Sequence, residues 1–124
     1  MENKNEKCTC GAEAQKIVMA CSGASDVGLI SDQVARSLQV GGVRNMSCLA
    51  MVGAGIENSI ESFKSKDLLV IDGCPIACGK RMMEHHNFEN YKHIVITEQG
   101  LKKGESPATT ENVRKIYQIA EENF

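Results

Sequence analysis

The chain has 124 residues, of which 42% are hydrophobic and 24% charged, and its formal net charge is −2. These values are ordinary for one soluble globular domain, and the near-neutral charge and absence of tryptophan argue against a nucleic-acid partner. No apolar run approaches the roughly 20 residues of a membrane-spanning helix, and the polar start lacks the apolar core of a signal peptide. We therefore expect a cytoplasmic protein with no membrane partner.

The first 15 residues are polar and contain Cys8 and Cys10 beside a glycine. We interpret residues 1–15 as a flexible Cys-x-Cys arm and residues 16–124 as a single α/β domain. The two thiols of the arm are accessory candidates for a site elsewhere, although two exposed thiols on an unstructured arm are the simpler interpretation.

From residue 16 onwards, short apolar runs alternate with longer amphipathic stretches. This alternation predicts a three-layer α/β sandwich with a mostly parallel, Rossmann- or flavodoxin-like sheet of about four strands. Ser25 or Asp26 is available to cap the first helix, and Gly41 and Gly42 end it. The expected strands cover residues 16–20, 43–50, 67–71 and 92–97, and the expected helices cover residues 25–39, 54–64, 75–86 and 110–122.

Three well-separated cysteines follow predicted strands. Cys21 comes directly after the first strand, Cys48 lies at or just past the end of the second, and Cys74 comes three residues after the third. Open α/β sheets bind ligands beyond the carboxyl ends of their strands. We therefore expect these thiols to gather at one edge of the sheet. Because structural disulfides are rare in the cytoplasm, reduced thiols for metal or redox chemistry fit best.

The segment DGCPIACG adds a fourth thiol, Cys78, to this edge. Asp72 and Gly73 predict a tight turn, and Pro75 suits the first position of a helix. Cys74 is then expected at the N-cap, with Cys78 one turn later on the same face, where the helix N-terminus favours thiolate. Asp72 is a candidate for a carboxylate behind the ligands, although we prefer it as a turn-forming residue.

Several interpretations of the Cys74–Cys78 pair remain open. A disulfide is geometrically allowed, a redox pair of the thioredoxin type would have two intervening residues in place of three, and free cysteine is often simply buried. Two converging thiolates also suit tetrahedral zinc, and Cys21 and Cys48 would complete its coordination. We favour the metal site.

Three segments carry a family resemblance: CSGASDVGLISDQVA, MSCLAMVGAG and DGCPIACGK. In this order they resemble the DGC-domain family, which is named for its Asp-Gly-Cys motif and expected to bind zinc. The resemblance implies a metal-ion partner and four chelating residues, namely Cys21, Cys48, Cys74 and Cys78. It defines no reaction, so it leaves open whether the chain is an enzyme, a metal-handling protein or a redox sensor. An iron–sulfur cluster uses the same ligands and ranks behind zinc.

A rival hypothesis is enzymatic. The segment KIVMACSGAS resembles the phosphocysteine loop of the IIB components of sugar phosphotransferase systems, with Cys21 as nucleophile at a helix N-terminus. This hypothesis leaves Cys48, Cys74 and Cys78 unexplained. The related Cys-x5-Arg phosphatase loop does not fit, because Val27 stands where the arginine is needed. We assign no ligand role to the histidines, and we expect His93 to be a solvated residue at the start of a strand.

Overall fold

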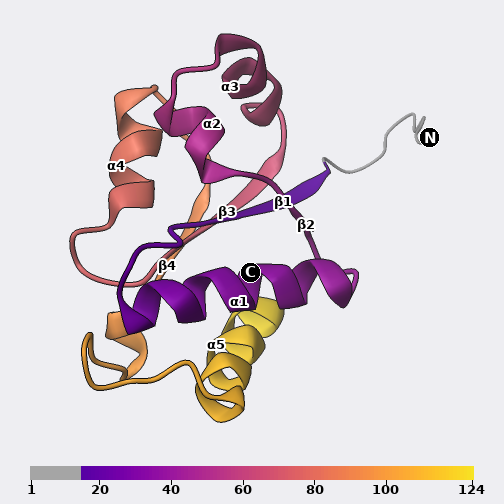
Figure 1. Ribbon diagram of the computed structural model, residues 1–124. Helices are drawn as coiled ribbons and strands as arrows, with labels where there is room; N and C mark the ends of the chain where they lie inside the picture. Colours follow the sequence, from indigo (N-terminus) through magenta and orange to yellow (C-terminus); the bar gives the residue numbers. More distant parts are fainter. Residues whose placement is uncertain (1–14) are drawn as a thin grey trace.

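The computed structural model describes residues 15–124, and a parallel sheet lies at its centre (Figure 1). The sheet has four strands in the order β2-β1-β3-β4, all parallel, so the predicted α/β fold is confirmed. The strands are β1 (Lys16–Ala20), β2 (Asn45–Met46), β3 (Asp67–Asp72) and β4 (Lys92–Val95). The helices are α1 (Asp26–Val40), α2 (Leu49–Gly53), α3 (Glu57–Phe63), α4 (Cys78–His85) and α5 (Thr110–Asn123), with a short 3₁₀ helix η1 (Ile96–Gln99).

Helices cover both faces of the sheet, which makes three layers. Figure 1 shows α1 and α5 on one face and α2, α3 and α4 on the other. Successive residues of β1 alternate between the two layers, because side chains along a strand point to opposite faces. Val18 packs in the core under α1 and α5, whereas Ile17 and Met19 pack in the core under the other three helices. Burial on both faces explains why β1 and β3 are continuous apolar runs.

Helix α1 begins and ends where its sequence signals predict. The Ser25 hydroxyl caps it by accepting a hydrogen bond from the Gly28 N–H at 3.1 Å. Gly41 ends the helix, and Gly42 follows with a φ of +75°, a conformation that glycine adopts without strain. The last helix, α5, is likewise capped by its preceding residue, Thr109, whose hydroxyl accepts from the Asn112 N–H at 3.1 Å.

The region after β2 differs from the prediction. The expected strand over residues 43–50 is only Asn45–Met46, because Cys48 turns the chain into α2 (Leu49–Gly53), a helix that the prediction lacks. The expected helix over residues 54–64 begins later, at Glu57, because Gly55 adopts a φ of +72° between α2 and α3. Similarly, β4 ends at Val95 and η1 replaces the last predicted strand residues. Within residues 15–124, no helix is long and apolar enough to cross a membrane.

Candidate metal centre at the carboxyl edge of the sheet

The crevice of this sheet lies between the carboxyl ends of β1 and β3. The chain leaves β1 toward β2 on one side, and it leaves β3 toward β4 on the other, so the strand order reverses between these neighbours. Such a switch point is where open α/β sheets bind ligands. Cys21 follows β1, and its N–H donates to the Ile71 carbonyl at 2.9 Å. The Cys21 loop and the Asp-Gly-Cys segment therefore leave the sheet side by side.

Two glycines allow these loops to pack backbone against backbone. A Cβ at Gly28 would lie 2.6 Å from the Gly23 carbonyl oxygen, and a Cβ at Gly73 would lie 2.8 Å from the Val27 carbonyl. Neither glycine has a positive φ, so lack of space, and not backbone conformation, makes glycine necessary. The first turn of α1 is thus clamped between the Cys21 loop and the Asp-Gly-Cys loop.

Helix α4 begins later than the sequence predicts. Cys74 is not its N-cap; Cys78 is its first residue, and the preceding Ala77 adopts a left-handed conformation with a φ of 52°. The Ala77 N–H donates to the Cys74 carbonyl at 3.0 Å, so residues 74–77 form a turn ahead of the helix. The start is set from outside the segment, because the Asp72 carboxylate accepts the N–H groups of Gly79 at 2.7 Å and Lys80 at 3.0 Å.

Asp72 and His93 also differ from their predicted roles. Asp72 is the last residue of β3, is 1% exposed and accepts a hydrogen bond from His93 Nε2 at 2.7 Å, so it is no turn-former. His93 is accordingly not a solvated residue. Sequence reasoning missed the pair, although one signal was present: a carboxylate at the end of an apolar strand must find buried donors.

Two of the predicted ligands lie on the same side of the sheet. Cys21 packs against the core that contains Met83 of α4, and Cys78 is the first residue of α4. Burial raises the pKa of the Cys21 thiol, and the negative charge of Asp72 raises it further. The raised pKa lowers the thiolate content of Cys21, which counts against it as a phosphate-accepting nucleophile.

Of the other two predicted ligands, Cys74 lies next to a basic side chain. The Cys74 sulfur is 3.9 Å from Lys103 Nζ. The pKa of Arg36 is raised, mainly by its hydrogen bond to Asp32 and to a smaller degree by the charge of Cys48. All four cysteines are free thiols, and in residues 15–124 no group of three or more cysteine, histidine, aspartate or glutamate side chains is arranged to hold a metal ion. Cys8 and Cys10 lie outside the described residues.

The differing surroundings of Cys21 and Cys48 predict an order of thiol reactivity. In metal-free protein at neutral pH, iodoacetamide should alkylate Cys48 faster than Cys21. Cys48 is exposed, whereas Cys21 is half-buried and has a raised pKa, so less of it is thiolate. A time course followed by mass spectrometry of peptides measures the order. Faster alkylation of Cys21 would contradict the electrostatic description of the site.

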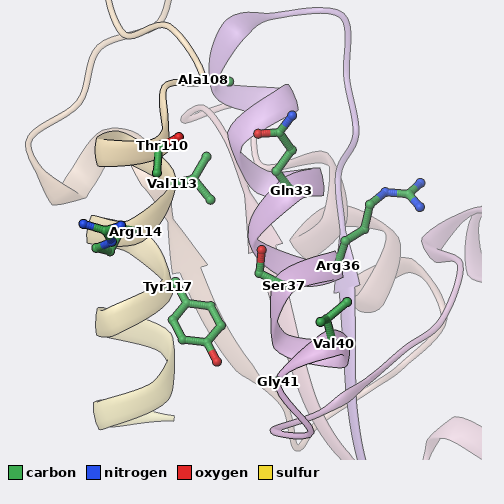
Figure 2. Close-up of a pocket in the computed structure, with 10 residues that line it drawn as sticks. All are labelled: Gln33, Arg36, Ser37, Val40, Gly41, Ala108, Thr110, Val113, Arg114 and Tyr117. Atoms are coloured by element: carbon green, nitrogen blue, oxygen red, sulfur yellow. The ribbon is translucent and has the colours of Figure 1, made fainter.

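A separate cavity, which no cysteine lines, lies between α1 and α5 (Figure 2). Its volume is about 650 Å³, and its lining includes Arg36, Arg114 and Tyr117 but no cysteine. Figure 2 shows the Tyr117 ring lying between the two helices. A Cβ at Gly41 would be 2.6 Å from the Tyr117 hydroxyl, so this glycine leaves room for the ring. The cavity offers no thiol for a metal, so the carboxyl edge is the candidate centre.

Comparison with known proteins identifies the family of this chain. The DGC domain matches residues 17–120, and the chain therefore belongs to the DGC-domain family. Among curated proteins, it is similar to the anaerobic and virulence modulator AnvM of Pseudomonas aeruginosa. The two are 34% identical over 88 residues, which are 70% of this chain and 67% of that protein. No solved structure matches the chain.

Proposed function

We propose that this protein binds zinc through the thiolates of Cys21, Cys48, Cys74 and Cys78. The observation that carries the proposal is the shared position of these residues. They lie in loops after β1, β2 and β3 and at the first residue of α4, all around the carboxyl edge of one sheet. Zinc prefers this kind of ligand and binds four thiolates in a tetrahedron.

Positively charged groups near the thiols support the proposal, because they would offset the negative charge of the metal site. Four thiolates around Zn²⁺ leave a net charge of about −2. Lys103 lies next to Cys74, and the N-terminus of α4 carries Cys78, so positive charge is present beside two of the four sulfurs. The donor set thus fits a soft metal in kind and in charge. Binding requires the four thiols to move closer together, because no three candidate ligands in residues 15–124 are arranged to hold a metal ion.

The proposed cellular role is metal handling or redox sensing. Four protein thiolates fill the coordination of zinc and leave no open position for water, so the bound metal would hold the three loops together and would not act as a hydrolytic centre. The name of the relative describes a modulator, which agrees with this interpretation. Oxidation of the thiols would release the metal, since only the thiolate is a ligand.

Cobalt titration under anaerobic conditions tests the ligand set. Co²⁺ replaces zinc and gives absorption bands that report tetrahedral thiolate coordination. The unaltered full-length chain should bind one equivalent, and each single change to serine at position 21, 48, 74 or 78 should weaken binding by at least about tenfold. The matched control, Cys8→Ser combined with Cys10→Ser, should bind like the unaltered chain. If only the control variant lost binding, the proposed ligand set would be wrong.

A further inference from the structure

The carboxylate of Asp72 is buried and fully engaged. It is 1% exposed, and it accepts hydrogen bonds from the Gly79 N–H at 2.7 Å, the Lys80 N–H at 3.0 Å and His93 Nε2 at 2.7 Å. A carboxylate buried to this degree is strongly unfavourable unless such bonds compensate it, and hydrogen bonds to a charged acceptor are the strong ones. The three bonds tie the end of β3 both to α4 and to β4.

Helix α4 depends on this carboxylate for its cap. Its own N-cap residue, Ala77, has no side chain that can accept a hydrogen bond, and its left-handed conformation is unfavourable for alanine. Gly79 and Lys80 are the second and third residues of the helix, and their N–H groups are the ones that a side chain at the N-cap normally accepts. Asp72 performs this task from the neighbouring strand. Cys78 thus lies between Ala77, which is in the left-handed conformation, and Gly79, whose N–H is bound by the Asp72 carboxylate.

Gly79 gives the carboxylate its access. A Cβ at this position would lie 2.9 Å and 3.2 Å from the two carboxylate oxygens of Asp72, and 2.7 Å from Val70 Cγ1. The residue that directly follows Cys78 must therefore be glycine for the helix to sit this close to β3. Gly79 thus has a steric role directly beside a proposed ligand.

We propose that Asp72, held in place by His93, is the positioning residue that fixes Cys78 beside Cys21. This inference rests on the proposed function, because it concerns two of the proposed ligands, but it makes a claim of its own. Cys21 packs against the core that contains Met83 of α4, so it lies on the side of the sheet where Cys78 begins this helix, and the position of Cys78 comes from a carboxylate that is not itself a proposed ligand. His93 orients that carboxylate through its Nε2–H, as outer hydrogen-bond partners orient ligands in metal sites.

The test compares Asp72→Asn, His93→Leu and His93→Gln in the full-length chain. Asp72→Asn and His93→Leu should weaken Co²⁺ binding by about 10–100-fold and alter its absorption bands. His93→Gln retains an N–H donor and should restore nearly unaltered binding. The matched control is His85→Leu, which removes an exposed imidazole from α4 and should leave binding unchanged. If Asp72→Asn and His93→Leu kept the circular dichroism, the cobalt affinity and the cobalt spectrum of the unaltered chain, the inference would be overturned.

Two measurements on metal-free protein separate this inference from the proposed function. Amide hydrogen exchange at Gly79 and Lys80 should quicken by about tenfold in Asp72→Asn, as expected for a lost cap. Phenylarsine oxide should bridge Cys21 and Cys78, forming two As–S bonds and releasing its oxygen as water with the two thiol protons. It should fail to do so in Asp72→Asn. If the unaltered chain bound no cobalt but showed both results, the proposed function would fail and the positioning role would stand; unchanged exchange and bridging would overturn the positioning role.

Discussion

Replacing Arg44 with methionine should lower the free energy of unfolding by about 3 kcal/mol. The Arg44 side chain is buried, and it donates to the carbonyls of Ile17 at 3.0 Å, Asp67 at 2.9 Å and Phe124 at 2.5 Å. It also pairs with the Asp67 carboxylate at 3.1 Å. Methionine fills similar space but leaves the buried carbonyls of β1 and β3 without a donor, and each such loss is costly.

Urea unfolding monitored by circular dichroism measures this loss. Arg114→Met is the matched control, because Arg114 is exposed on α5 and its replacement should change stability by no more than about 0.5 kcal/mol. Equal stabilities for the two variants would show that Arg44 does not join β1, β3 and the end of α5 as described.

The ion pair between Arg44 and Asp67 predicts that the stability of the protein depends on pH. Burial alone would raise the pKa of Asp67, but the charges and hydrogen bonds of Arg44 and Lys92 outweigh it and lower the pKa overall. A lowered pKa contributes stability above the unfolded value of about 3.9, and this contribution is lost as the pH falls through the lower folded value. The stability difference between the unaltered chain and Arg44→Met should therefore shrink in acid. A difference that stays constant across this range would contradict the pairing.

The second large effect is expected from Gly28→Ala, which should cost about 3 kcal/mol of stability and weaken cobalt binding. The added Cβ would meet three backbone atoms of Gly23 at 2.6–2.9 Å, and backbone cannot move aside as a side chain can. Relief of the clash would push the Cys21 loop away from α1 and from the Asp-Gly-Cys loop. Cobalt titration and urea unfolding of the same preparation measure both effects.

Gly53→Ala is the matched control for this steric argument. Its Cβ would meet the flexible side chain of Met82, at 3.1 Å from the sulfur and 3.3 Å from the methyl carbon. Alanine also favours the helix by up to about 1 kcal/mol. This variant should be as stable as the unaltered chain or more so, and it should bind cobalt normally. A loss as large as that of Gly28→Ala would mean that glycine content alone, and not the packing of the loops, decides stability.

Much of the fold could be predicted from the sequence because burial leaves a clear pattern. The apolar runs of β1 and β3 and the amphipathic period of α1 are local features, and Ser25 and Gly41 mark the ends of that helix. The gathering of the strand-following cysteines at one edge needed only the inference that the strands are parallel. Both steps depend on short-range sequence pattern and general topology.

The details of the site could not be predicted, because distant residues decide them. The start of α4 is set by the carboxylate of Asp72, seven residues before Gly79. That carboxylate is in turn held by a hydrogen bond from His93 on another strand. Pro75 and Cys74 gave a local signal for an earlier start, and the carboxylate from β3 overrode it. Likewise, the short β2 follows from the turn at Cys48, where the chain enters the five-residue helix α2.

The most direct test of the central claim is metal analysis of the full-length chain purified without oxygen, with its visible absorption recorded. The zinc site proposed here predicts about one zinc per chain, no colour, and loss of that zinc when Cys21, Cys48, Cys74 and Cys78 are changed to serine. Brown protein containing iron and sulfide would indicate that the same residues hold an iron–sulfur cluster and not zinc. Folded protein that contains no metal and takes none up would contradict the claim.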